Sequence, residues 1–141
     1  MSTILIVANQ TLPSQDLATE VTRRIASGSR DFHVVVPATP PPGSGFTWDE
    51  EAARTAAEER LEAFKKRLAD QGATAEGEIG DRDPVQAARD AARGRDVFEI
   101  ILSTLPTGAS KWLRQDVPGR MRSAFDVPVS VVEEQATARA G

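Results

Sequence analysis

The sequence has 141 residues, 40% hydrophobic and 27% charged, which suits one globular domain with its own core. It contains no cysteine, which excludes disulfides, thiolate metal sites and a cysteine nucleophile. The longest apolar run, residues 4–8, is far too short to cross a membrane, and no signal peptide is visible. These features predict a cytoplasmic protein that does not bind membranes.

Charge is unevenly distributed along the chain. The net charge is -4, but residues 105–125 have a balance of +3 and the rest of the chain therefore carries -7. A nucleic-acid-binding protein needs a broad basic face, so the sequence predicts no nucleic-acid partner. The basic segment is either a local anion site or a set of solvated side chains near a helix end.

The chain begins with a strand and a helix. Residues 3–8 form a continuous, largely β-branched apolar run, which is typical of a strand buried on both faces. Thr11 or Ser14 can cap the helix that follows. Apolar residues recur on one side of that helix at intervals of four, namely Leu17, Val21 and Ile25.

A second strand and a long helix come next. Residues 32–36 are apolar and end at Pro37, which cannot donate to a sheet ladder. A proline- and glycine-rich loop leads to a helix that begins near Trp48 and Asp49 and ends at Gly72. The apolar stripe expected on it is Ala53, Ala57, Leu61, Phe64 and Leu68.

The third strand is expected at a sheet edge, because residues 74–79 alternate charged and small or apolar side chains. Asp83-Pro84-Val85-Gln86 resembles a capping box with Pro84 at the first helical position. A short alanine-rich helix over residues 85–93 then ends at Gly94.

The central strand is predicted over residues 97–103, with Glu99 placed near its outer end. A long loop follows, rich in small hydroxyl residues and cations. Asp116 is a candidate cap for the next helix, which runs to about Phe125, and residues 129–132 form the last strand.

Alternating strands and helices predict an α/β fold, with an open parallel sheet and helices on both faces. Residues 1–133 are expected to form the single domain, and residues 134–141 a flexible C-terminal tail. Ligands of such sheets bind where strands end and loops begin, so the loop after residue 103 is the expected site.

Three segments together resemble the universal stress protein family. Residues 4–8 match its opening strand, residues 80–88 its turn into the third helix, and residues 126–132 its terminal strand. The resemblance covers nearly the whole chain. It implies a Rossmann-like sheet of five parallel strands in the order 3-2-1-4-5. It also implies a homodimer paired through the last strand, at Val129, Val131 and Val132.

The ATP-binding members of that family carry a glycine motif that holds phosphates through backbone and helix amides. Laid over this chain without gaps, its first two glycines fall on Leu102 and Leu105, and its Gly-Ser pair on Gln115 and Asp116. The family's acidic residue at the end of the first strand falls on Asn9. The chain thus resembles a divergent member that lacks the ATP motif, and we expect neither ATP nor another resident cofactor.

The altered loop nevertheless has side chains that suit a different nucleotide or a phosphate metabolite. Hydroxyl groups, a glycine and two cations can together cradle an anion, or they can be ordinary loop residues. The candidate ligand residues are Asn9, Ser103, Thr104, Thr107, Gly108, Ser110, Lys111 and Arg114.

No catalytic or metal-binding arrangement is visible in the sequence. His33 is the only histidine and lies on an apolar strand, where a structural role is the simpler interpretation. Trp112 either anchors the loop or forms part of a surface for a protein partner, and Trp48 has the same ambiguity. The sequence therefore predicts a non-enzymatic stress-response or signalling module, with ligand binding through residues 103–120 as the alternative.

Overall fold

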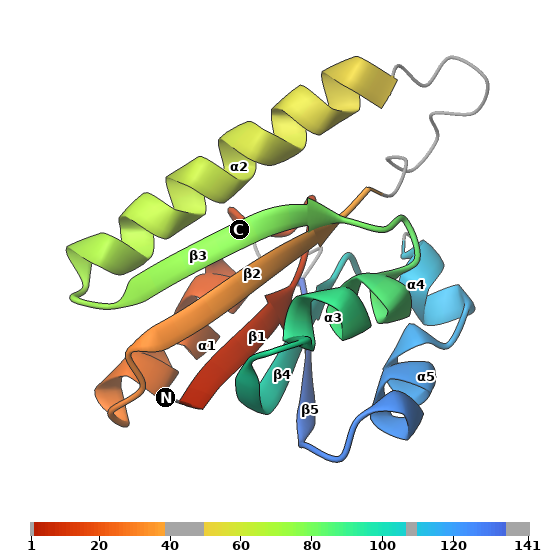
Figure 1. Ribbon diagram of the computed structural model, residues 1–141. Coiled ribbons are helices and arrows are strands. Elements are labelled where there is room, and N and C mark those ends of the chain that lie inside the picture. Colours follow the sequence, from red (N-terminus) through yellow and green to blue (C-terminus); the bar gives the residue numbers. More distant parts are fainter. Residues whose placement is uncertain (1, 39–49, 107–109, 135–141) are drawn as a thin grey trace.

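A computed structural model of the chain describes residues 2–38, 50–106 and 110–134, excluding the side chain of Lys111. Its five strands and five helices alternate along most of the chain (Figure 1). In chain order they are β1 (Ser2–Val7), α1 (Gln15–Ala26), β2 (Asp31–Pro37), α2 (Glu50–Asp70), β3 (Thr74–Gly80), α3 (Pro84–Ala92), β4 (Asp96–Thr104), α4 (Lys111–Arg114), α5 (Val117–Ala124) and β5 (Val129–Glu133).

The strands form one parallel sheet in the order β3-β2-β1-β4-β5, which confirms the predicted fold class. The weak, charged strand β3 lies at an edge, as its alternating pattern predicts. Central strand β1 pairs on both sides, so that Ile6 lies between Val34 and Ile101. All five carboxyl ends therefore lie at the same edge of the sheet.

Successive residues of β1 point into two separate hydrophobic clusters. Ile4 and Ile6 pack with α1 and α2 on one face, and Leu5 and Val7 pack with α3, α4 and α5 on the other. All four side chains are fully buried. This arrangement explains why the first strand is a continuous apolar run rather than an alternating one.

Helix α1 begins as the sequence predicts, whereas the start of α3 confirms the prediction only in part. Ser14 caps α1, and its Oγ accepts a hydrogen bond from the Leu17 amide at 3.1 Å. Pro84 does open α3, but Asp83 makes no side-chain capping bond, and Gln86 bonds to Asp90 instead. The predicted capping box is therefore wrong.

The prediction for Glu99 is also wrong. Glu99 is the fourth residue of the nine-residue strand β4, not a residue near its end. Its carboxylate is tolerated there because it pairs with Arg24 of α1 at 2.6 Å. A register shift beside Thr3 and Ile4 leaves Phe98 without a pairing partner on β1, and Phe98 is the exposed large hydrophobic residue of the described chain.

The predicted long loop after β4 is partly helical. Residues 111–114 form the short helix α4, which the sequence pattern does not predict, and α5 begins at Val117 with Asp116 as its cap. The start proposed for α2 at Trp48 and Asp49 and most of the predicted tail lie outside the described residues.

Candidate functional site

The predicted site lies at the carboxyl edge of the sheet, where β1, β2 and β4 end. Parallel strands bring their carboxyl ends to one edge of the sheet, so Asn9 after β1 and Ser103 near the end of β4 lie at the same edge although they are far apart in sequence. Both side chains are buried, as are those of Thr104 and Ser110.

Asn9 is held by two partners and is 5% exposed. Its Nδ2 donates to the Pro37 carbonyl at 2.9 Å, and its Oδ1 accepts from Arg60 Nη1 at 2.7 Å. Arg60 belongs to α2, which sequence reasoning did not connect with the site. The Asn9 amide is thus engaged by the protein itself on both of its polar ends.

Ser103 is likewise engaged within the protein. Its Oγ lies 2.7 Å from the hydroxyl of Thr11, which also lies 3.3 Å from the Ser103 carbonyl. Thr11 therefore ties the segment after β1 to the end of β4, and does not cap α1. Its role was missed because its partner is 92 residues away along the chain.

Thr104 is different from its neighbours. The residue is 1% exposed, and its Oγ1 has no hydrogen-bond partner in the described part of the chain. A buried hydroxyl without a partner is uncommon, since its desolvation is not compensated. Thr104 therefore retains unused hydrogen-bonding capacity at the end of β4.

Of the other predicted ligand residues, Ser110 and Arg114 have side chains that the structure describes. Ser110 caps α4, with its Oγ accepting from the Leu113 amide at 3.1 Å. Arg114 is exposed at the end of α4. Thr107 and Gly108, together with the side chain of Lys111, lie outside the described residues.

Trp112 anchors α4 to the core, as the simpler interpretation predicts. It is 7% exposed and belongs to the cluster that contains Val7, Leu102 and Met121. Trp48, which has the same ambiguity in the sequence, lies outside the described residues.

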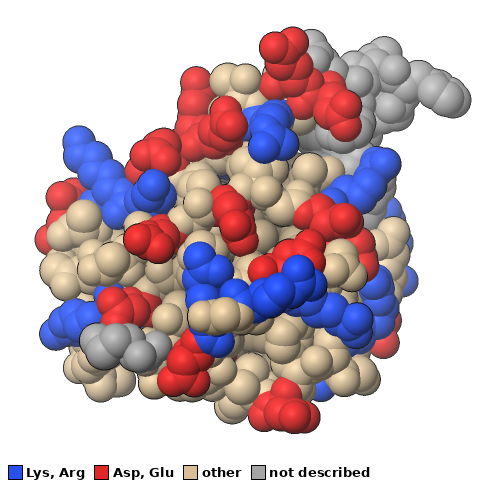
Figure 2. Space-filling model, in the orientation of Figure 1, with Lys and Arg blue, Asp and Glu red and all other residues tan. Residues whose placement is uncertain are grey.

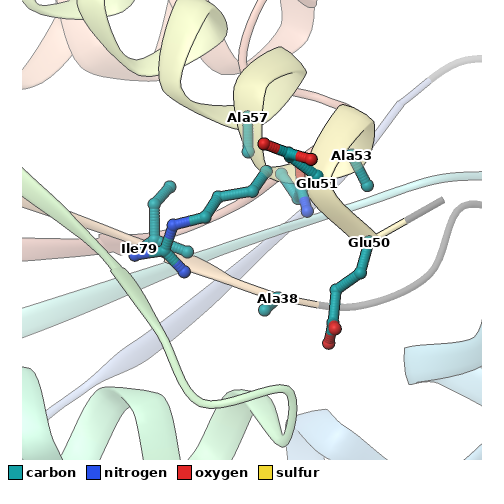
Figure 3. A pocket seen from close by; sticks show the side chains of 8 residues that line it. Ala38, Glu50, Glu51, Ala53, Ala57 and Ile79 are labelled. Carbon is teal, nitrogen blue, oxygen red and sulfur yellow. The ribbon is translucent and has the colours of Figure 1, made fainter.

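A pocket of about 330 Å³ adjoins Asn9 at the amino end of α2 (Figure 3). Its lining is partly apolar and also includes acidic and basic side chains of α2. The lining residues are Asn9, Ala38, Glu50, Glu51, Ala53, Arg54, Ala57 and Ile79. The carboxylates of Glu50 and Glu51 oppose the binding of a polyanion at this position.

His33 lies away from this edge, in the first half of β2 and buried at 4% exposure. Neither ring nitrogen has a hydrogen-bond partner in the described chain, although Nε2 lies 3.4 Å from a carboxylate oxygen of Glu78. Burial lowers the pKa of His33 below its ordinary value, with the charge of Arg95 acting in the same direction and Glu78 opposing it. The imidazole is therefore held neutral within the core.

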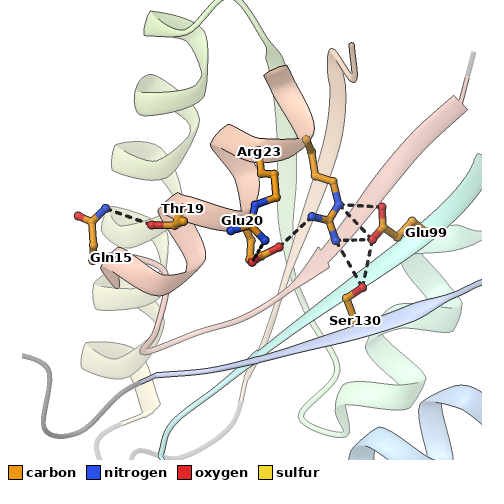
Figure 4. Close-up of polar contacts among 7 residues, drawn as sticks. Gln15, Thr19, Glu20, Arg23, Glu99 and Ser130 are labelled. Atoms are coloured by element: carbon orange, nitrogen blue, oxygen red, sulfur yellow. Dashed lines mark hydrogen bonds and ion pairs between the residues drawn. The ribbon is translucent and has the colours of Figure 1, made fainter. Parts of the chain in front are cut away.

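A polar network links α1 with β4 and β5 (Figure 4). Arg24 donates to both oxygens of Glu99 and also pairs with Glu20 at 2.8 Å, while the Ser130 hydroxyl donates to Glu99 at 3.2 Å. The hydrogen bonds from Arg24 lower the pKa of Glu99 against the opposing effect of burial. Both members of the central pair are satisfied, so the network is structural in character.

Within residues 2–38, 50–106 and 110–134, no group of three or more histidine or acidic side chains is placed to hold a metal ion. No described helix is long and apolar enough to cross a membrane. Acidic and basic side chains are interspersed on the face shown in Figure 2.

No protein-family model matches the sequence, and no curated protein matches it. Among solved structures, the chain is similar to a protein of the universal stress protein family from Burkholderia pseudomallei. The two share 16% sequence identity with a TM-score of 0.65, over 92% of this chain and 94% of the other. The chain therefore has the fold of a universal stress protein.

Proposed function

We propose that this protein is a non-enzymatic stress-response or signalling module that does not bind ATP in the way usual for universal stress proteins. The fold of the Burkholderia protein supports the first part of the proposal. The observation that carries the second part is the internal pairing at the carboxyl edge of the sheet. Asn9 is bonded to Pro37 and Arg60, and Ser103 to Thr11, so these groups are occupied without a ligand.

Two residues at the aligned motif positions support the same proposal. Leu102 is completely buried in the core, whereas the motif has a glycine that lets backbone approach phosphate. Asp116 caps α5, with its carboxylate accepting from the Gly119 amide at 3.3 Å. A carboxylate at this helix start repels a phosphate electrostatically.

Thermal unfolding with magnesium and ATP tests the proposal. We expect the melting temperature to remain unchanged at millimolar ATP. A ligand at 100 times its dissociation constant stabilises the native state by about 2.7 kcal/mol, so binding at micromolar affinity would give a clear rise. Saturable ATP binding in calorimetry, weakened by Asn9→Ala, would overturn the proposal.

The alternative is a nucleotide- or phosphate-metabolite-binding protein that uses the altered loop. The unpartnered, buried Thr104 hydroxyl favours it, because a ligand oxygen could accept that hydrogen bond. The test is calorimetric titration with AMP, cyclic nucleotides and inorganic phosphate. Binding that is weakened about tenfold by Thr104→Val, but not by Thr22→Val at an exposed position of α1, supports this alternative. No heat from any of these probes argues against it.

The absence of catalytic activity is part of the main proposal. His33, the only histidine of the sequence, is buried in the first half of β2, away from the carboxyl edge. Incubation of ATP or AMP with the protein should therefore leave the nucleotide intact, as followed by phosphate release. Turnover that survives further purification and is abolished by a single substitution in the loop would contradict this part.

We also propose that the protein is cytoplasmic and that it assembles as a homodimer through β5. β5 is an edge strand, and Val129, Val131 and Val132 are only half-buried in the single chain. Sedimentation at micromolar concentration should give a dimer, and Val131→Lys should give a monomer with an unchanged circular dichroism spectrum. A wild-type monomer under these conditions would argue against the dimer.

A further inference from the structure

One outward face of α2 takes no part in the core or in the candidate site. Glu59, Ala63 and Arg67 are all exposed and follow one another at intervals of four residues, so they share one face of the helix. We call these three residues the α2 face. α2 covers the β3 side of the sheet (Figure 1), at the opposite edge from β5.

The α2 face borders a groove of about 420 Å³ between α2 and the segment after β1. Its lining is largely apolar and includes Leu12, Pro13 and Phe64. Leu12 and Phe64 are nearly fully buried and form its floor, whereas Pro13 is exposed. The groove therefore has an apolar centre, and the charged residues on its helix side are Glu59, Arg60 and Arg67.

Glu59 and Arg67 are available for partners outside the chain. Other charged residues of α2 form pairs along the helix, such as Arg54 with Glu58 at 3.7 Å and Lys65 with Glu62 at 3.1 Å. In the described part of the chain, neither the Glu59 carboxylate nor the Arg67 guanidinium has a hydrogen bond or an ion pair. The nearby Arg60 guanidinium is turned inward to Asn9.

The order of charges makes this face complementary to itself. Glu59 precedes Ala63 by as many residues as Arg67 follows it. A two-fold axis through Ala63, perpendicular to α2, therefore brings Glu59 of one copy opposite Arg67 of the other, and the reverse. The small side chain of Ala63 at the centre allows the two helices to approach closely.

We propose that the α2 face binds the α2 face of a second copy of this chain, with the two helices antiparallel. The contact is separate from pairing through β5, because the two surfaces lie at opposite edges of the sheet. A single helix pair buries little area, so the association is weak and depends on salt. It is expected at concentrations on the order of hundreds of micromolar in low salt.

Charge reversal tests the proposal by sedimentation equilibrium. Glu59→Arg and Arg67→Glu each place like charges opposite one another at both ends of the contact. Each variant should weaken this self-association about tenfold or more. The double variant, Glu59→Arg with Arg67→Glu, should restore it, and a mixture of the two single variants should associate better than either alone. Since these side chains are exposed, the melting temperatures should stay close to wild type.

Glu58→Arg provides the matched control, because it is the same reversal on another side of α2. It should leave the association unchanged. The proposal is overturned if the double variant fails to restore association, if the two single variants do not associate on mixing, or if Glu58→Arg weakens association equally. Repeating the series in Val131→Lys separates this contact from β5 pairing, so that either can fail alone.

Discussion

Glu99 and His33 are both polar side chains inside the sheet, but they differ in their hydrogen bonds and in their state of ionisation. Glu99 accepts hydrogen bonds from Arg24 and Ser130, which keep it ionised. His33 has no hydrogen-bond partner in the described chain, and burial keeps it neutral. The first residue stabilises the fold only through its partners, and the second makes the fold sensitive to acid.

Replacing His33 should change how stability depends on pH. The pKa of His33 is lowered in the folded protein. Below pH 6.5 the unfolded chain therefore binds a proton at His33 that the folded chain does not bind. The free energy of unfolding therefore falls as pH falls through this value, by at most about 1.4 kcal/mol per pH unit from this group. His33→Gln should flatten the dependence between pH 7 and pH 5, as measured by urea unfolding. An unchanged slope would show that other groups cause it.

Breaking the Arg24–Glu99 pair should be costly. Its side chains are 19% and 14% exposed, so Glu99→Ala leaves a partly buried guanidinium without its main partner. We expect a loss of about 3 kcal/mol in urea unfolding. Arg23→Ala is the matched control on α1, since Arg23 is 64% exposed, and it should cost no more than about 1 kcal/mol. Equal losses would contradict a special role for the Glu99 pair.

At the scale of elements, the sequence predicts the ends of helices well where the capping residue has no competing partner from a distant part of the chain. Ser14 caps α1, and Gly72, with a φ of +83°, lies just after α2 as expected. Asp83 failed as a cap because its carboxylate instead binds Arg120 of α5 at 2.8 Å, a partner 37 residues away. Helix α4 was missed because four residues are too few for a periodic pattern.

Asp116 should be replaceable by asparagine but not by alanine. It has a φ of 53°, a left-handed conformation that asparagine tolerates, and it caps α5 through Gly119. Asp116→Ala loses the cap and keeps the strain, so we expect a loss of about 1–2 kcal/mol in urea unfolding. Asp116→Asn should stay within about 0.5 kcal/mol of wild type. Equal losses in both variants would indicate a role for the charge instead.

Gly77 should be essential for the packing of β3 beneath α2. A Cβ atom at this position would lie 2.6 Å from Leu61 Cδ1 and 2.8 Å from the Val34 carbonyl oxygen. The backbone oxygen cannot move away without distorting β2, so Gly77→Ala should lower the free energy of unfolding by about 1–3 kcal/mol. Glu76→Ala, at the exposed neighbouring position, should change stability by no more than about 0.5 kcal/mol. A neutral Gly77→Ala would mean that β3 shifts freely.

At the scale of the whole molecule, the fold was predictable and the arrangement of the site was not. The alternation of strands and helices gave the parallel sheet, and the family resemblance gave its strand order. The partners of Asn9 and Thr11 lie 51 and 92 residues away, and only the folded chain brings them together. A sequence pattern can show which side chains reach the carboxyl edge, but not which of them bind one another there.

The burial of Trp112 also gives the molecule an intrinsic optical reporter. The sequence has two tryptophans, so a Trp48→Phe variant leaves Trp112 as the sole indole emitter. Its emission should be blue-shifted and poorly quenched by iodide while α4 remains docked on the core. A red shift at denaturant concentrations below the main unfolding transition would reveal that the segment after β4 detaches before the sheet itself comes apart.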